Sequence, residues 1–245
     1  MSDPALNEMY RCLEQGDPVF LPSRFWETLG GQHRDQLTTS GYANFKRTLA
    51  SNYFTWLISP RNNQSRFLAR RMAFRDWNAI LREPFTFDPS LPFPRRYQRF
   101  LQIYTRMLWR FVERGDTEGI LQTLPEPTEG NPFPITLGGR LISQDLANSV
   151  LEYYAIREHF RRDRDAAITI AELGAGYGRN AYVLLNQFPH CRYIVIDIPP
   201  ALYVAQRYLQ AVFPEKRVAQ TPCEATPEEI AAAVEAAEIA FLLPH

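Results

Sequence analysis

Residues 167–185 have the sequence "AITIAELGAGYGRNAYVLL", in which three glycines, each two positions apart, separate an apolar run from a helical pattern. The apolar run "AITIAEL" is short and contains β-branched residues, which predicts a buried strand of a parallel sheet. Because glycine adopts backbone conformations that other residues avoid, Gly174, Gly176 and Gly178 predict a tight turn at the end of that strand. The segment "RNAYVLLNQF" then predicts a helix that begins at the turn.

The alternation of strand and helix patterns continues to the end of the sequence. The strand pattern "RYIVIDI" is followed by the helix pattern "PALYVAQRYLQAVF", the weaker strand pattern "KRVAQT", the helix pattern "TPEEIAAAVEAAE" and the strand pattern "IAFLLPH". Thr226 and Glu229 predict a capping box at the start of the last helix, and Ser143 predicts the N-cap of a helix that precedes the first strand. This order predicts an α/β fold, a Rossmann-like parallel sheet with helices on both faces.

The first half of the chain has a different pattern. From Asn44 to about Phe111 it is rich in arginine and aromatic residues, and its apolar residues recur at three and four positions, which predicts amphipathic helices. Prolines interrupt this pattern at 84–94 and again at 124–140. The second break predicts two domains: a helical N-terminal or lid region at 1–140 and a Rossmann-like domain at 141–245.

Composition excludes several classes of protein. The chain has 27 basic and 27 acidic residues, which gives no global positive charge for a nucleic-acid partner. Its three cysteines, Cys12, Cys191 and Cys223, are odd in number and lack metal-ligand spacing, which favours a reducing compartment over a disulfide framework. The start "MSDPALNEMY" has no apolar signal core, and no run is long enough to cross a bilayer. We therefore expect a cytoplasmic protein without a membrane, nucleic-acid or metal partner.

Three explanations compete for the glycine turn: a dinucleotide such as NAD, S-adenosylmethionine, or no ligand at all. Ligands of parallel α/β sheets bind outside the carboxyl ends of the strands, where the next helix offers free N–H groups. The dinucleotide fingerprint is G-x-G-x-x-G, but Arg179 stands where its third glycine would be. Glu172, two residues before Gly174, would repel a pyrophosphate and attract the sulfonium and amino groups of S-adenosylmethionine. The sequence therefore favours S-adenosylmethionine.

A second carboxylate, Asp197, ends the next predicted strand, 19 residues after Gly178. An acidic residue at this position accepts hydrogen bonds from a ribose diol. NAD enzymes use the same position, so Asp197 indicates nucleoside binding without distinguishing the two cofactors. A Rossmann-like scaffold that binds no cofactor remains the alternative.

These motifs resemble those of class I S-adenosylmethionine-dependent methyltransferases. More narrowly, the segments "NFKRTLASNYFTWL", "ISQDLANSVLEYY", "ELGAGYGRNAYVLL", "YIVIDIPPALYVAQRYL" and "FLLPH" resemble a bacterial family of sugar O-methyltransferases, over about Asn44 to the last residue. The resemblance implies that the cofactor is held by Glu172 at its methionine end, by the glycine turn, and by Asp197 at its ribose. The full predicted set is Glu172, Gly174, Ala175, Gly176, Tyr177, Gly178, Asp197 and Ile198. The narrower family implies a sugar hydroxyl as the methyl acceptor.

The sequence departs from this class in the number of strands. Class I methyltransferases have a seven-stranded sheet, whereas the patterns here account for about four strands. The resemblance assigns "FLLPH" to the fourth strand, so we expect the later strands to be absent and the fourth strand to be an unpaired edge through which copies associate. His245, at the carboxyl end of that strand, is the candidate general base, although a terminal histidine is commonly solvated.

Other residues have both a functional and a structural explanation. Tyr177 lies inside the turn, where it either contacts the cofactor or packs on the following helix. Gln144 and Asp145 lie in a first helical turn and are better explained as caps than as cofactor ligands. His33, His159 and His190 are interpreted as structural or solvated.

Two further groups are more simply structural. Arg66, Arg70 and Arg71 occupy neighbouring helical positions and favour a solvated basic face over an anion site for a sugar phosphate or nucleotide-sugar. The aromatic stripe is interpreted as helical core rather than a sugar-stacking surface; it comprises Tyr53, Phe54, Trp56, Phe67, Tyr104 and Trp109.

Three functional classes follow from the sequence. The first is an O-methyltransferase acting on a small molecule, for which the resemblance implies a sugar. The second is an RNA or protein methyltransferase, which the balanced charge and the lack of an Asn-Pro-Pro-Tyr type motif disfavour. The third is a non-catalytic or degenerate fragment that binds the cofactor weakly or not at all.

Overall fold

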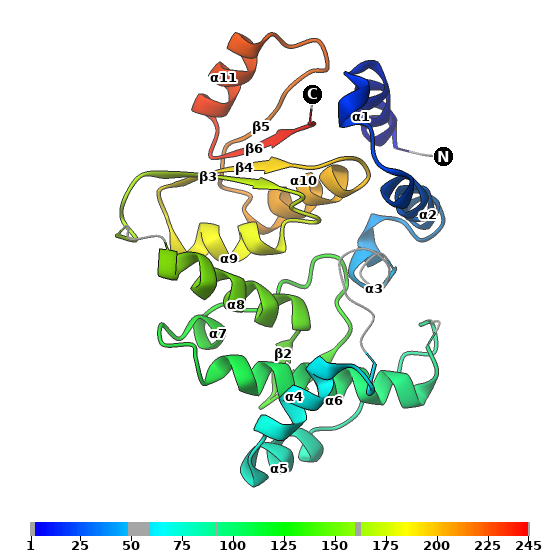
Figure 1. Cartoon of the computed structure of the whole chain (residues 1–245), viewed down its shortest axis with the longest axis vertical. Helices are drawn as coiled ribbons and strands as arrows, with labels where there is room; N and C mark the ends of the chain where they lie inside the picture. Colours follow the sequence, from blue (N-terminus) through cyan, green and yellow to red (C-terminus); the bar gives the residue numbers. More distant parts are fainter. Residues whose placement is uncertain (1–2, 49–58, 92, 160–162, 245) are drawn as a thin grey trace. The chain divides into compact units, whose positions relative to one another are not determined.

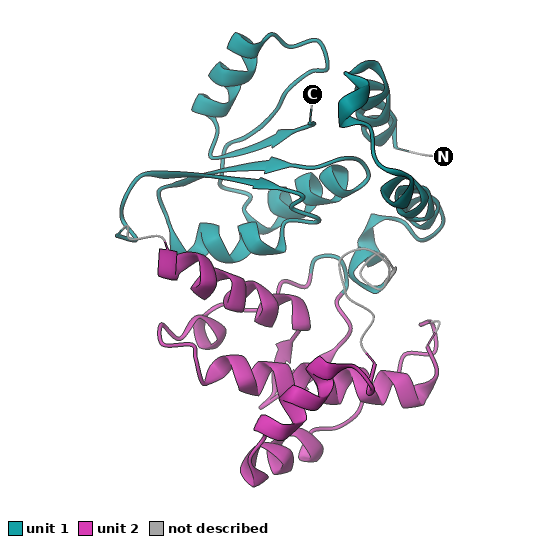
Figure 2. Ribbon diagram, in the orientation of Figure 1, with its two compact units in different colours: residues 1–54, 129–131, 160–245 teal, residues 55–128, 132–159 magenta. Residues whose placement is uncertain are grey.

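The computed structural model describes residues 3–48, 59–91, 93–159 and 163–244. The chain divides into two units, which Figure 2 shows in different colours. Unit 1 consists of residues 1–54, 129–131 and 160–245, and unit 2 consists of residues 55–128 and 132–159. Both units are therefore built from segments that alternate along the chain, whereas the sequence predicts one boundary near residue 140.

Unit 1 contains a four-stranded parallel sheet with the order β3-β4-β6-β5. Its strands and the helices between them are β3 (Ile168–Leu173), α9 (Arg179–Gln187), β4 (Cys191–Ile196), α10 (Ala201–Val212), β5 (Val218–Gln220), α11 (Pro227–Ala236) and β6 (Ile239–Leu242). Figure 1 shows α9 and α10 on one face of the sheet and α11 on the other. The predicted α/β class with a parallel sheet of about four strands is confirmed.

The side chains of β4 explain why this face of the sheet is covered. Tyr193 and Val195 are buried on one side of the strand, where Val204 and Leu209 of α10 are also fully buried. Alternate residues of a strand point to opposite faces, so the apolar period of two directs these side chains toward the helices. This contact positions the start of α10 beside the end of β4.

The edge strand β3 differs from the sequence prediction of a fully buried strand. Thr169, Ala171 and Leu173 share one face of the strand and are exposed, and the Leu173 side chain is 78% exposed. Burial of an edge strand depends on what packs on each face, and an apolar composition does not reveal this.

The last strand, β6, was expected to be an unpaired edge, and this expectation is wrong. β6 pairs in parallel with β4 on one side, with Ile196 opposite Leu242, and with β5 on the other, with Gln220 opposite Phe241. β5 precedes β6 in the sequence but lies at the edge of the sheet, outside β6. The order of strands in the sequence therefore differs from their order in the sheet. Self-association through an open β6 edge is therefore excluded.

The helices described in residues 3–48 belong to unit 1. They are α1 (Pro4–Gln15), η1 (Pro18–Phe20), α2 (Arg24–Ser40), η2 (Tyr42–Asn44) and α3 (Phe45–Thr48). α1 contacts α10 and buries Leu6, Met9 and Leu13. The segment 129–131 joins the same unit because the Gly130 carbonyl accepts a hydrogen bond from the Lys46 N–H at 3.0 Å.

Unit 2 is mostly helical. It contains α4 (Asn63–Arg71), α5 (Phe74–Arg82), α6 (Arg95–Glu113), α7 (Ile120–Thr123), α8 (Gln144–His159) and the antiparallel hairpin β1 (Ile135–Leu137) and β2 (Arg140–Ile142). The hairpin lies in the segment that the sequence predicts to be a loop. Its turn is formed by Gly138 and Gly139, with φ values of 60° and 76°, and two left-handed residues suit a tight hairpin.

The predicted helix caps are confirmed. The Ser143 hydroxyl accepts a hydrogen bond from the Leu146 N–H at 2.9 Å at the start of α8. The Thr226 hydroxyl and the Glu229 carboxylate form the capping box of α11. Because a cap depends on residues a few positions apart, its signal is readable in the sequence.

The predicted aromatic core is confirmed in part. Tyr104 and Trp109 are buried in α6, but Phe67 is 44% exposed on α4, so its assignment to the core is wrong. Tyr53, Phe54 and Trp56 lie outside the described residues. Within the described part of the chain, no helix is both long and apolar enough to cross a membrane.

Candidate functional site

The glycine turn lies where the sequence places it, between β3 and α9. Gly174, Gly176 and Gly178 have φ values of 77°, 60° and 86°, all in the left-handed region that favours glycine. The Gly174 N–H donates to the Ile196 carbonyl at 2.8 Å, which ties the turn to the end of β4. Gly178 is also the N-cap of α9. The turn therefore presents its backbone at the carboxyl edge of the sheet.

Asp197 connects the ends of the two neighbouring strands. One carboxylate oxygen accepts a hydrogen bond from the Gly176 N–H at 2.7 Å, and the other accepts one from the Ile198 N–H at 2.7 Å. The residue is only 9% exposed. Burial raises the pKa of Asp197 to about 6, while the two backbone N–H groups act in the opposite direction and the charge of Glu172 raises it further.

Glu172 lies on β3 and is half-buried. Its two oxygens accept hydrogen bonds from the Tyr193 hydroxyl at 2.7 Å and from the Asn180 side-chain amide at 3.0 Å. Tyr193 is buried in β4 and Asn180 lies in the first turn of α9. Glu172 is thus held by side chains of the neighbouring strand β4 and of α9.

Tyr177 packs inside unit 1 against α3 and α10. Its side chain is 2% exposed, and its ring centroid lies 5.1 Å from those of Phe45 on α3 and Tyr208 on α10. The Lys46 ammonium lies 5.7 Å from the Tyr177 centroid and 5.1 Å from the Tyr208 centroid. Tyr177 therefore anchors the turn to two helices, while its backbone remains part of the turn.

The structure brings together most of the predicted cofactor residues. Glu172, the turn residues Gly174 to Gly178, Asp197 and Ile198 all lie at the carboxyl ends of β3 and β4. Ala175 is buried there, and Ile198 is half-buried. His245, the candidate general base, lies outside the described residues. Gln144 and Asp145 lie in the first turn of α8, which belongs to unit 2.

Sequence reasoning missed the partners that hold this site. Tyr193 and Asn180 bond to Glu172, and Phe45 and Lys46 pack on Tyr177. Phe45 and Tyr177 are 132 residues apart in the sequence, so no local pattern connects them. Tyr193 had a readable signal, since it is a hydroxyl-bearing residue at a buried position of the β4 pattern, which alternates in burial.

The arginine cluster on α4 lines a cavity of about 390 Å³ together with Asn63 and Phe67. Arg71 also lies over the Phe67 ring, with 4.7 Å between its guanidinium carbon and the ring centroid. The cavity residues belong to one helix face, which agrees with the interpretation of Arg66, Arg70 and Arg71 as a basic surface.

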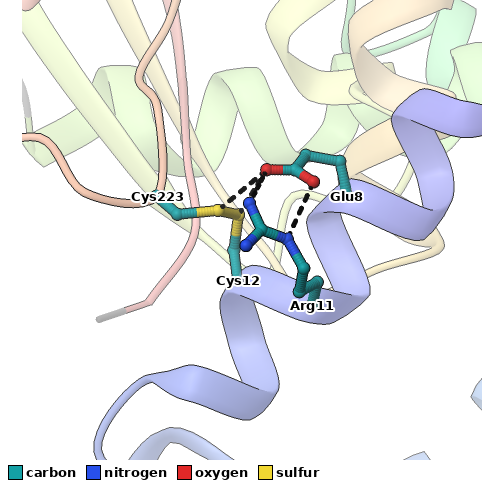
Figure 3. Close-up of a disulfide and its surroundings, with 4 residues drawn as sticks. All are labelled: Glu8, Arg11, Cys12 and Cys223. Atoms are coloured by element: carbon teal, nitrogen blue, oxygen red, sulfur yellow. Dashed lines mark hydrogen bonds and ion pairs between the residues drawn. A yellow bond between two sulfur atoms is a disulfide. The ribbon is translucent and has the colours of Figure 1, made fainter.

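The cysteines correct the sequence interpretation. Cys12 of α1 and Cys223, in the loop after β5, form a disulfide with a Cα–Cα distance of 5.1 Å (Figure 3). Cys191 is free and buried in β4. The two bonded residues are 211 positions apart, and only the packing of α1 beside the sheet brings them together. Glu8, Cys12 and Cys223 also place three metal-ligating atoms within 4.8 Å of one another.

Comparison of the chain with models of protein families, with curated proteins and with solved structures found no match.

Proposed function

We propose that unit 1 binds S-adenosylmethionine at the carboxyl ends of β3 and β4, and that the chain is a methyltransferase acting on a hydroxyl group. One observation carries the proposal: the Asp197 carboxylate at the end of β4 bonds the N–H of Gly176 in the turn after β3. The bond aligns the glycine turn with an acidic strand end. This is the combination that holds the ribose and the adjoining part of a nucleoside cofactor.

The first two strands and the helix between them support a Rossmann-like assignment. β3 and β4 are consecutive, parallel neighbours, like strands 1 and 2 in the 3-2-1 half of a doubly wound sheet. The helix α9 connects β3 to β4, and α10 follows β4 on the same face (Figure 1). The later strands depart from that order: β6, the fourth strand in chain order, lies beside β4, whereas a doubly wound sheet places its fourth strand beside the first.

The residues at this site fit the cofactor. Each carboxylate oxygen can accept two hydrogen bonds, so Asp197 retains acceptor capacity for a ribose diol after bonding two backbone N–H groups. A Cβ built on Gly174 would meet no heavy atom within 4 Å, so the turn leaves open space at this point. Glu172 supplies a negative charge beside the turn for the amino or sulfonium group.

Methyl transfer needs little chemistry from the protein. The cofactor supplies an activated methyl group on sulfur, and the protein orients the acceptor and removes a proton from its hydroxyl. In this chain Asp197 and the glycine turn perform the binding role. His245 remains the predicted base, and a sugar remains the predicted acceptor on the strength of the resemblance.

A second function, a scaffold that binds no cofactor, rests on a specific observation. Both oxygens of Asp197 and both oxygens of Glu172 already accept hydrogen bonds from the protein. These bonds join β3, β4 and α9, which is a sufficient structural reason for two acidic residues at this position.

Calorimetric titration with S-adenosylhomocysteine separates the two functions. We expect the unaltered chain to bind and Asp197→Ala to bind roughly tenfold to over a hundredfold more weakly, because a charge-assisted hydrogen bond to the ribose is lost. Asp165→Ala is the matched control, since Asp165 is an exposed carboxylate in the loop before β3. Circular dichroism would verify that each variant is folded.

No measurable binding by the unaltered chain would support the scaffold. Equal affinity of Asp197→Ala and the unaltered chain would show that the cofactor, if bound, is held elsewhere. Transfer of a labelled methyl group to a panel of sugars and nucleotide-sugars would then test the acceptor.

A further inference from the structure

The disulfide between Cys12 and Cys223 joins two parts of unit 1 at the carboxyl edge of the sheet. Cys12 lies in the last turn of α1, and Cys223 lies in the loop between β5 and α11. Their Cα–Cα distance of 5.1 Å is within the usual range for a disulfide. Figure 3 shows the two sulfur atoms beside the Glu8 and Arg11 side chains of the same helix.

A cavity of about 210 Å³ is lined by both cysteines. Its other lining residues come from α1, from the start of α10 and from the ends of β5 and β6; they are Glu8, Met9, Leu202, Gln220, Thr221, Pro222, Phe241 and Leu243. The disulfide therefore fixes one wall of this cavity, α1, to the loop that forms another wall.

A separate contact holds the opposite end of α1. The Asp3 carboxylate caps the helix by accepting from the Ala5 N–H at 2.9 Å. It also accepts from the Tyr203 hydroxyl at 2.8 Å and pairs with Arg207, both on α10. The first turn of α1 is therefore attached to α10 without the disulfide, whereas the last turn is packed through the buried Leu13 side chain and is attached to the loop by the disulfide.

We propose that the Cys12–Cys223 pair is a reversible thiol–disulfide latch that holds the last turn of α1 over this cavity. When the pair is reduced, the last turn detaches from the loop and the cavity opens, while Asp3 keeps the first turn on α10. The latch depends only on unit 1 and is independent of the proposed cofactor site.

The exchange reaction follows from the exposure of the two sulfur-bearing residues. Cys12 is 6% exposed, whereas Cys223 is half-buried in a loop whose neighbours Pro222 and Glu224 are exposed. The thiolate of a small thiol attacks the Cys223 sulfur, the S–S bond breaks, and Cys12 leaves as a thiolate that takes up a proton. A second small thiol attacks the mixed disulfide, which releases Cys223 as a thiol and the small molecule as its own disulfide. Two electrons and two protons are gained by the protein.

Glu8 sets the rate of this exchange. Its Oε1 atom lies 3.3 Å from the Cys223 sulfur and 4.0 Å from the Cys12 sulfur, and Arg11 bonds both carboxylate oxygens at 2.5 and 3.0 Å. A carboxylate disfavours a nearby thiolate, so it slows both attack and departure of the leaving sulfur. We expect the disulfide of the Glu8→Gln variant to react with a small thiol faster than that of the unaltered chain. The disulfide of Glu14→Gln, a change on the same helix, should react at the unaltered rate.

The latch can be tested on the full chain in buffers of reduced and oxidised glutathione at a series of ratios. Alkylation followed by mass spectrometry measures the oxidation state of each cysteine. Amide hydrogen exchange measures the protection of the backbone of α1. We expect Cys12 and Cys223 to become reduced together in one two-electron step, while Cys191 reacts only after denaturation. On reduction, the amides of residues 12–16 should exchange roughly tenfold faster or more, and those of residues 5–7 should be unchanged.

Three outcomes would overturn the latch. Independent titration of the two cysteines would show that they do not form a redox pair. A pair that stays oxidised in fully reduced buffer would be a permanent cross-link. Unchanged exchange at residues 12–16 after reduction would show that the disulfide does not hold the turn.

Substitutions separate the latch from a metal site. In oxidising buffer, Cys12→Ser and Cys223→Ser should each show the fast amide hydrogen exchange at residues 12–16 that the reduced chain shows. Cys191→Ser should keep the slow amide hydrogen exchange of the oxidised chain. If one equivalent of Zn²⁺ instead protects both thiols of the reduced chain from alkylation and slows exchange at 12–16, the pair is a metal site with Glu8 and the latch is wrong.

Discussion

At Asp197, burial and hydrogen bonding act on one carboxyl group in opposite directions. The two backbone N–H groups favour the charged form, but the nearly complete loss of water favours the neutral form and is the larger effect. The result is a carboxyl group with a pKa of about 6 at the edge of the sheet. Its charge therefore changes at about this pH, and the proposed binding of a ribose diol should change with it.

This shifted pKa predicts a pH dependence of stability. The pKa of Asp197 is raised from 3.8 in the unfolded chain to about 6 in the folded chain, so its contribution is fully present below pH 3.8 and is lost as the pH rises to about 6. The loss amounts to up to about 3 kcal/mol. Urea unfolding of the unaltered chain and of Asp197→Asn, at pH values from 4 to 7, measures it. A stability difference between the two that does not change with pH would contradict the raised pKa.

The glycine turn predicts different costs for two similar substitutions. Gly174 and Gly178 both have positive φ, so alanine at either position costs about 1–2 kcal/mol from backbone strain alone. At Gly178 the added Cβ would also lie 2.9 Å from the Leu209 Cδ1 atom, whose side chain is fully buried. We expect Gly178→Ala to lower the free energy of unfolding by a further ~1–3 kcal/mol.

Leu209→Ala provides the test of this crowding. In the Gly178→Ala background it removes the clashing atom, so the double variant should be more stable than the sum of the single effects predicts. If the effects of Gly178→Ala and Leu209→Ala on the free energy of unfolding are additive, the Leu209 side chain does not clash with the added Cβ.

At the scale of elements, α1 depends on Asp3 for more than its cap. Asp3 caps α1 and bonds two residues of α10, whereas Asp17 caps η1 through the Val19 N–H. A lost cap costs about 1 kcal/mol. We expect Asp3→Ala to release the first turn of α1 from α10 and Asp17→Ala to leave it in place. Hydrogen exchange of residues 5–7 measures the difference, and equal protection in both variants would contradict it.

At the scale of the whole molecule, unit 2 is centred on a buried arginine. Arg106 is fully buried in α6 and donates to three carbonyls, those of Thr136 at 2.9 Å, Ile80 at 3.3 Å and Pro84 at 2.7 Å. These carbonyls belong to the hairpin, to α5 and to the loop after α5. One side chain thus joins the hairpin to α5 and its following loop, which are far from the hairpin in the sequence.

Replacing this side chain should destabilise unit 2 selectively. Arg106→Met keeps the volume but leaves three carbonyls without their donor, which we expect to cost about 2–5 kcal/mol. Arg110→Met is the matched control on the same helix, because Arg110 makes a partly exposed ion pair with Glu113 that is worth at most about 1 kcal/mol. Urea unfolding followed by hydrogen exchange would locate the loss. Similar stability of both variants would contradict the role of Arg106.

The sequence by itself determined the features that depend on neighbouring residues. The alternation of strands and helices, the glycine turn, the acidic strand end at Asp197 and the caps at Ser143 and Thr226 could all be predicted, because turns, caps and periodicity are set within a few positions. These features also located the candidate site, since the carboxyl ends of parallel strands meet at one edge.

Only the tertiary structure decided which distant segments meet. It placed β6 between β4 and β5, joined Cys12 to Cys223, and packed Phe45 against Tyr177. Strand order and these contacts come from the burial of whole faces against one another, and the spacing of residues along the chain does not encode them. The same reason explains why the partners of Glu172, the buried Arg106 and the exposed face of β3 were found only in the fold.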